Sequence, residues 1–248
     1  MSSGQVVEGG SEERRGEESS SMREPILISS DELSRAIRAG ENIWKRPDSP
    51  VDTSVQWGAS KYPSKITSEQ VKKCREVFRI PHNIQLIRPE PHERACYPRP
   101  GCVAVSDHLL RAGLRLPFHP FFRLVLRSFG LAPTQFNPNA WSQMVGTWML
   151  WRRVSIGVDM PFSVFHSLFF PKATAGGEAS KGWYYLAPWG SHSPFVVETP
   201  SSIKGWRSSW FWASGRWDTV ENDPMAPLTV PTTYSTCSKQ LFDLNLLG

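Results

Sequence analysis

The feature that most constrains this chain is its segment 101–141, GCVAVSDHLLRAGLRLPFHPFFRLVLRSFGLAPTQFNPNAW. The segment is dense in apolar residues, and Asp107 is its one acidic residue. Gly and Pro interrupt it at intervals of helix length, and both residues commonly mark helix ends. We therefore predict several short helices packed into a mildly basic core. The segment contains no recognisable catalytic constellation.

The punctuation of this segment predicts where its helices begin and end. Ser, Asp and Asn cap helix N-termini, Pro suits a first turn, and Gly commonly follows a last turn. A short extended piece over 103–105 precedes the helices. The predicted helices are one capped by Ser106 or Asp107 and closed by Gly113, one over 120–129 stopped by Gly130, one capped by Asn137 with Pro138 in its first turn and Arg152 near its end, and one opened by Asp159 and Pro161 that contains Phe169.

The flanking segments complete an α+β fold. Thr67 and Gln70 have the spacing of a capping box and predict a helix that Pro81 ends. Residues 83–87 alternate weakly and predict a short strand. Short aromatic and β-branched runs after Pro171, separated by Gly, Pro and Ser, indicate a small antiparallel β-meander. We therefore predict a mainly helical core over 67–170, with the meander over 182–217 packed on it.

Composition divides the chain into three parts. Residues 1–60 are predicted to form a disordered tail and linker, with a candidate short helix over 30–39. Residues 61–218 form the predicted domain, and residues 219–248 an irregular C-terminal tail. Residues 1–60 hold 7 Lys and Arg against 11 Asp and Glu, whereas the rest holds 21 against 12. A basic domain favours phosphate-bearing partners, although ordinary solubilising charge explains the same excess.

Cysteine usage and hydropathy limit where such a chain works. The four cysteines are few and irregularly spaced, which favours a reducing compartment over a disulfide scaffold. We therefore expect an intracellular protein, in cytoplasm or nucleus. No apolar run approaches the roughly 20 residues of a membrane-spanning helix, so we expect no membrane partner.

Two groups of residues are candidates for a catalytic or metal centre. A metal-dependent strand transferase needs converging carboxylates, for which Asp107 and Asp159 with Glu198 or Asp218 are the candidates. The first two stand where helix caps are expected, so capping or surface roles are favoured.

Zinc ligands come in short paired spacings. His92, Cys96, Cys102 and His108 lack such a spacing, and prolines stiffen their loop. We therefore expect no enzyme, cofactor, metal or small-molecule substrate.

Basic and aromatic side chains form the candidate binding residues. Arginines flank the apolar helices and could contact phosphates, or their stems could simply cover the rim of the core. Tryptophans near residue 210 could stack on bases, or pack one face of a strand on the core. The nucleic-acid candidates are Arg111, Arg115, Arg123, Arg127, Arg152 and Arg153, and the aromatic group is Trp206, Trp210, Trp212 and Trp217.

Several motifs carry a family resemblance that spans residues 78–217. They are FRIP (78–81), YPRPG (97–101), DHLLRAGLRLPFHPFFRLVL (107–126), FGLAPTQFNPNAW (129–141), and KGW followed by WFW (204–212). In order and spacing they resemble the N-terminal domain of plant gypsy-type transposon proteins, a family named "putative transposase, gypsy type".

The resemblance implies a function without implying catalysis. Members of this family are gag-like products of long-terminal-repeat elements, so it implies a structural or interaction protein of a plant retrotransposon that acts by self-association or partner binding. A nucleic-acid-binding module that uses basic helix faces is the alternative. Family members often continue into a charged, coiled-coil-rich region, so we expect a truncated or degenerate copy here.

Overall fold

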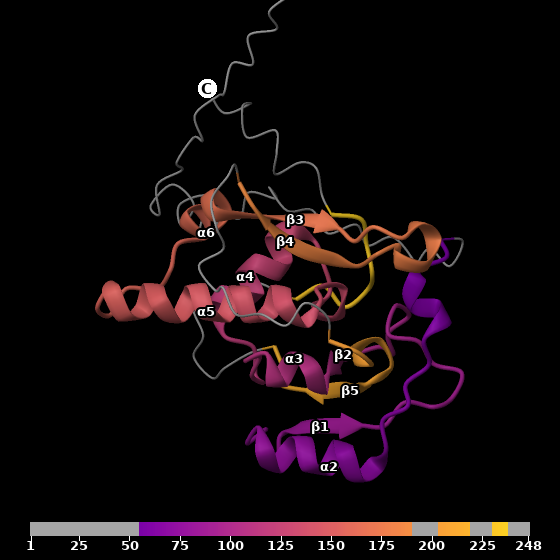
Figure 1. The fold of residues 1–248 in the computed structure, drawn as a ribbon. Helices are drawn as coiled ribbons and strands as arrows, with labels where there is room; N and C mark the ends of the chain where they lie inside the picture. Colours follow the sequence, from indigo (N-terminus) through magenta and orange to yellow (C-terminus); the bar gives the residue numbers. More distant parts are fainter. Residues whose placement is uncertain (1–54, 190–202, 219–229, 238–248) are drawn as a thin grey trace, which may run out of the picture.

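The computed structural model describes residues 55–189, 203–218 and 230–237 of the chain (Figure 1). Helices and antiparallel strands are both present in these ranges, which confirms the α+β class. The predicted helix over 30–39 lies outside the described residues, as does one of the aromatic and β-branched runs predicted after Pro171, residues 195–198. The elements are α2 (Ser68–Val77), β1 (Ile84–Ile87), β2 (Cys102–Ser106), α3 (Asp107–Arg111), α4 (Pro120–Phe129), α5 (Pro138–Val154), α6 (Phe162–Leu168), β3 (Phe169–Ala173), β4 (Tyr184–Pro188) and β5 (Trp210–Gly215).

The helices begin at the predicted caps because those caps satisfy backbone groups locally. At the start of α2, the Thr67 hydroxyl accepts from the Gln70 amide at 3.2 Å, and the Gln70 side chain accepts from the Thr67 amide at 2.8 Å. The Asn137 side chain accepts from the Ala140 amide at 2.7 Å at the start of α5. Gly130 ends α4 in the left-handed conformation, with φ of 66°.

Two helix boundaries differ from the prediction. Asp159 does not open α6, because its carboxylate accepts from Arg152 Nη1 at 3.0 Å. Pro161 caps that helix instead, without a side-chain hydrogen bond. Phe169 is not in the helix either, because α6 ends at Leu168 and the chain turns directly into β3.

The sheets correct the predicted meander. The strands do pair antiparallel, but β5 lies between β1 and β2, and β4 pairs with β3 in a separate hairpin. Ala213 of β5 stands opposite both Leu86 and Val103, so the sheet joins parts of the chain more than 100 residues apart. The strands of 182–217 therefore do not form one meander, because β5 finds its partners among N-terminal strands.

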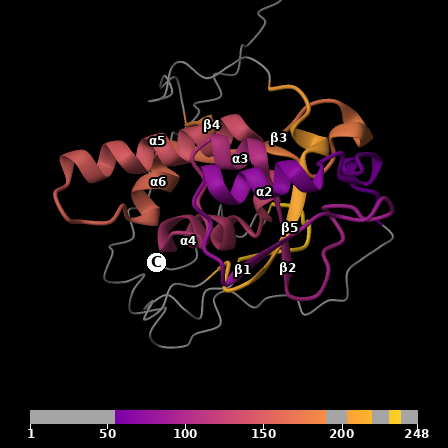
Figure 2. The same cartoon turned by 90° about the horizontal axis from the view of Figure 1, so that it is seen from below.

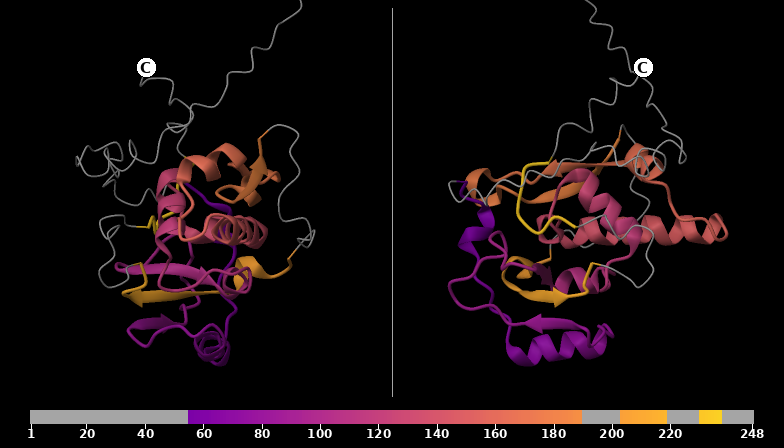
Figure 3. Two further views of the ribbon diagram at one scale, coloured as in Figure 1. Left: turned by 90° about the vertical axis from the view of Figure 1, so that its left-hand side faces the viewer. Right: turned by 180° about the vertical axis from the view of Figure 1, so that it is seen from behind.

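Both faces of the three-stranded sheet are buried. One face turns Val103, Phe211 and Ala213 into the main core, where α2 and α3 cover it (Figures 2 and 3). The opposite face turns Trp210 and Trp212 into a second cluster formed with the 88–100 connection. Alternation along β5 thus serves two apolar layers rather than one.

The motif FGLAPTQFNPNAW is tied to the end of the described chain. Gln135, in the short 3-10 helix η2 (Pro133–Gln135), is buried and donates to the Gly182 and Ser235 carbonyls. Tyr234 donates to the Thr134 carbonyl at 3.1 Å. Residues 55–60 join the same region, since Trp57 is buried against Tyr234. Material on both sides of 61–218 therefore packs with the domain, whose exact limits stay predictions.

Candidate interaction surfaces

The carboxylates considered for a catalytic centre are held by local partners. Asp107 contacts His108 Nδ1 at 2.8 Å and accepts from Ser209 Oγ at 2.6 Å, while Asp159 is engaged by Arg152. Glu198 lies outside the described residues. Among 55–189, 203–218 and 230–237, no three His, Cys, Asp or Glu side chains gather closely enough to hold a metal ion. Among the described residues, Asp107, Asp159 and Asp218 are therefore not brought together.

The cysteine and histidine candidates for a zinc site differ in burial. Cys96 and Cys102 are buried as free thiols, whereas His92 is exposed. Burial raises the pKa of the Cys96 thiol to about 12, so at neutral pH this thiol is protonated and a poor nucleophile or metal ligand. His108 faces Asp107 instead of a thiol.

The first two candidate arginines serve structural contacts. Arg111 extends from α3 and lies 3.4 Å from Asp107, one helical turn earlier. Arg115 donates to the Leu110 and Leu114 carbonyls and stacks over the Phe78 ring at 5.5 Å. Both side chains are exposed, but their heads are engaged in contacts near α2 and α3.

The other four arginines do not extend this group into one basic face. Arg123 has an exposed fraction of 0%, so it cannot contact phosphates, and the prediction that it belongs to a nucleic-acid face is wrong. Arg127 is half-buried on the same helix, α4. Arg152 and Arg153 are exposed at the far end of α5. Arg123 lies among the buried residues of α4, between Phe122 and Val125 in the chain, whereas Leu124 and Arg127 are only half-buried.

A different surface stands out at the C-terminal end of α5, which projects beyond the rest of the described chain (Figures 1 and 3). The helix has 17 residues and is therefore about 25 Å long. Its fully buried side chains end at Thr147, and in its last two turns Trp148 and Trp151 still pack against the core while Met149, Leu150 and Val154 are exposed. Exposed apolar side chains gather here and on the following turn. This surface, called the α5 tip below, comprises Met149, Leu150, Val154, Ile156 and Val158.

Hydrogen bonds give the α5 tip a defined shape. The Ser155 amide donates to the Trp151 carbonyl at 2.8 Å, and Trp151 Nε1 donates to the Val158 carbonyl at 3.2 Å. Gly157 turns the chain with φ of 77°. Ile156 is thereby held with 92% of its surface exposed, and Val154 with 75%. Apolar surface held exposed in this way is a candidate interaction site.

The tryptophan group is mostly part of the core. Trp210, Trp212 and Trp217 are buried, whereas Trp206 is half-buried. Base stacking by the whole group is therefore wrong, and Trp206 is the member that solvent reaches. Trp206 lies in the 3-10 helix η4 (Trp206–Ser208) in edge-to-face contact with Trp183, and the Arg207 guanidinium lies near both the Trp206 and the Tyr62 rings.

Sequence reasoning missed the α5 tip. The signal was present, because Val154, Ile156 and Val158 alternate with polar and small residues just beyond the predicted helix. An isolated alternation of three residues does not reveal whether the core lies beneath it. The grouping of Tyr62, Trp183 and Trp206 around Arg207 carried no such signal, since 144 residues separate Tyr62 from Trp206 in the chain.

Comparisons with known proteins identify the middle of the chain. Residues 103–172 match a family model described as "putative gypsy type transposon". The match contains helices α3 to α6 and therefore most of the helical core, and it confirms the gypsy-type resemblance for this part. Neither the curated proteins nor the solved structures include a match.

Proposed function

We propose that this transposon-related chain is a non-enzymatic, gag-like structural protein of a plant retrotransposon, and that it works by self-association through the α5 tip. The observation that supports this most strongly is the exposure of Val154 and Ile156 on a turn fixed by hydrogen bonds. Fully burying one such side chain stabilises a contact by roughly 1.5–3 kcal/mol.

Charge around the α5 tip favours a second copy of the chain as the partner. The apolar side chains are bordered by Arg152 and Arg153 and by Asp159, so both signs of charge are present. In a two-fold dimer, the same surface of both copies forms the interface, so that a residue i of one copy contacts residue j of the other and the reverse contact is also made. Arg153 of one copy can then approach Asp159 of the other while the apolar side chains meet at the centre.

The alternative, nucleic-acid binding through basic helix faces, is less favoured in the form predicted. Arg123 is inside the core, and Arg111 and Arg115 belong to contacts near α2 and α3. Arg152 and Arg153 extend from the projecting end of α5. A phosphate backbone needs several cations along one path, and these side chains do not supply it.

Sedimentation velocity of the full chain over a wide concentration range tests the proposal. We expect a dimer that dissociates on dilution, and a monomer for the double variant Val154→Ser/Ile156→Ser. The matched control is Val77→Ser, which removes an exposed apolar side chain from α2 and leaves the α5 tip intact. A wild-type chain that stays monomeric at every concentration would overturn the proposal, as would equal loss of the dimer in the control.

A further inference from the structure

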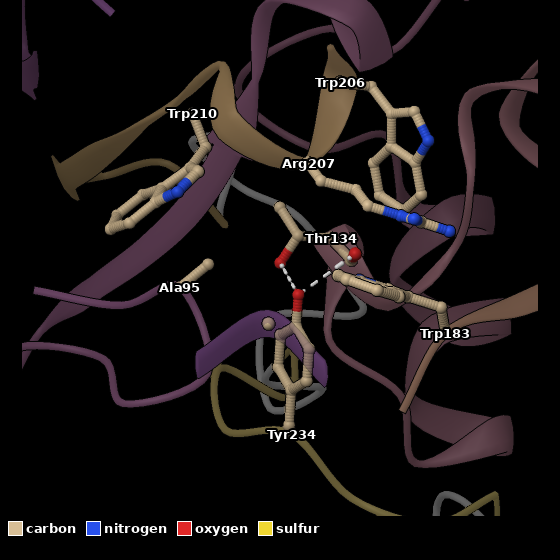
Figure 4. A pocket seen from close by; sticks show the side chains of 8 residues that line it. Ala95, Thr134, Trp183, Trp206, Arg207, Trp210 and Tyr234 are labelled. Carbon is tan, nitrogen blue, oxygen red and sulfur yellow. Dashed lines mark hydrogen bonds between the residues drawn. The ribbon is translucent and has the colours of Figure 1, made fainter. Parts of the chain in front are cut away.

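A second surface combines aromatic rings with an arginine that they surround. The Arg207 guanidinium carbon lies 4.3 Å from the centre of the Trp183 ring and 5.6 Å from those of Tyr62 and Trp206. The rings also contact one another edge to face, with Trp183 5.4 Å from Tyr62 and 5.5 Å from Trp206. Figure 4 shows the guanidinium between the Trp206 and Trp183 rings.

No carboxylate neutralises this arginine within the described chain. Arg207 makes no hydrogen bond or ion pair to any described residue, and its Nε is buried without a hydrogen-bond partner. Cation–π contact orients the guanidinium but leaves its charge and its donors available. As far as the described residues are concerned, the charge of Arg207 therefore remains available to an anion.

Three exposed lysines lie close to these rings in the chain or through a backbone hydrogen bond. Lys61 precedes Tyr62, and Lys204 comes two residues before Trp206. Lys65 is next to the same helix, because its amide donates to the Ser208 carbonyl at 2.7 Å. We call the group formed by Lys61, Tyr62, Lys65, Lys204, Trp206 and Arg207 the basic aromatic surface.

Glu178 and Asp107, the acidic side chains that the described ranges place near this surface, are already paired. Glu178 Oε2 lies 3.8 Å from Lys181 Nζ, and Lys181 stands two residues before Trp183 in the chain. Asp107, which contacts Ser209 beyond η4, also contacts His108 and Arg111. The remaining charge of the surface is therefore positive.

The space beneath the rings is too small for an organic ligand. The cavity, lined in part by Trp183, Arg207 and Tyr234, has a volume of about 10 Å³, which holds one water molecule. A ligand must therefore lie across the surface, where Tyr62 and Trp206 are half-buried and the lysines are exposed.

We propose that the basic aromatic surface binds single-stranded nucleic acid. Unpaired bases stack on aromatic side chains whatever their sequence, while Lys and Arg follow the phosphates. Trp206 and Tyr62 supply the rings, and Lys61, Lys65, Lys204 and Arg207 supply the positive charge. Duplexes hide their base faces, so they should bind less tightly than single strands. This site is separate from the α5 tip and does not depend on self-association.

Fluorescence anisotropy of a labelled single-stranded oligonucleotide, titrated with the full chain at several salt concentrations, tests this proposal. We expect Trp206→Ala to weaken binding by about 5- to 150-fold, the range for loss of one stacking ring. Lys65→Glu/Lys204→Glu keeps the rings and should lower the slope of log affinity against log salt by about 1.4 or more, because two phosphate contacts are lost. This charge variant tests the surface even if Trp206→Ala does not fold.

The matched control is Lys172→Glu/Arg216→Glu, which reverses the charge of two exposed basic side chains outside the surface. Lys172 is on β3 and Arg216 comes just after β5. We expect it to bind like the wild type apart from a small non-specific loss. No binding at low salt would overturn the proposal. So would equal losses in the control and the Lys65/Lys204 variant, or anionic lipid vesicles that bind with the same dependence on Trp206.

Discussion

Gln135, a residue of the family motif, allows a sharp test of what the motif does. Its side chain is buried and makes four hydrogen bonds. Nε2 donates to the Gly182 carbonyl at 3.0 Å and to the Ser235 carbonyl at 2.7 Å, while Oε1 accepts from the Ala132 amide at 3.0 Å and the Ser235 amide at 3.1 Å. We predict that Gln135→Leu destabilises the chain without altering either proposed surface.

The magnitude follows from those four bonds. A net contribution of about 0.5–1.5 kcal/mol per bond gives a loss of roughly 2–6 kcal/mol in the free energy of unfolding. The value belongs in the upper half of this range, because leucine leaves the backbone groups of residues 132, 182 and 235 buried without these partners. For a chain of this size, a loss of about 4 kcal/mol lowers the Tm by roughly 8–16 °C.

Thermal and urea unfolding, followed by circular dichroism, measure this effect. Gln143→Leu is the matched control, since Gln143 is half-buried on α5 and its side chain makes no hydrogen bond to any described residue. We expect a change within about 0.5 kcal/mol for the control. A Gln135→Leu chain as stable as the control would refute the view that this residue joins the motif to the end of the described chain.

Three further predictions concern stability. The hydrogen bond from Arg99 lowers the pKa of Glu93 from 4.5 to about 2, so this carboxylate stabilises the fold above pH 4.5 and the stabilisation is lost as pH falls towards 2. In urea unfolding measured at a series of acid pH values, Glu93→Gln should therefore lose less stability between pH 4.5 and 2 than the wild type. Burial raises the pKa of Cys96 from 9.0 to about 12, so stability present below pH 9 is lost as pH rises towards 12, and Cys96→Ala should show a shallower alkaline fall in urea titrations. Asn137→Ala removes the cap of α5 and should cost about 1 kcal/mol in urea unfolding.

The elements that could be predicted are those decided within a few residues. The caps at Thr67 and Asn137 are local hydrogen bonds, and Gly130 is a local conformation, so each is visible in sequence. The position of β5 could not be predicted in this way, because its partners precede it by more than 100 residues. His119 caps α4, since its Nδ1 accepts a hydrogen bond from the Phe121 amide. This cap was not predicted because histidine is an uncommon N-cap residue.

The candidate surfaces were predictable to a smaller extent. An arginine in an apolar helix was expected to contact phosphates or to stay at the rim, but Arg123 is fully buried with its neighbours Phe121, Phe122 and Val125. The α5 tip depends on where the core stops beneath a helix, which only tertiary packing decides. Arg207 illustrates the same limit, since its three rings come from residues 62, 183 and 206.

Hydrogen exchange measured at several protein concentrations tests the central claim most directly, because it locates self-association as well as detecting it. The account predicts that amide protection over residues 149–158 rises with concentration, while protection over α2, including Val77, stays constant. Exchange that does not depend on concentration, or protection that rises elsewhere and not at the α5 tip, would contradict it.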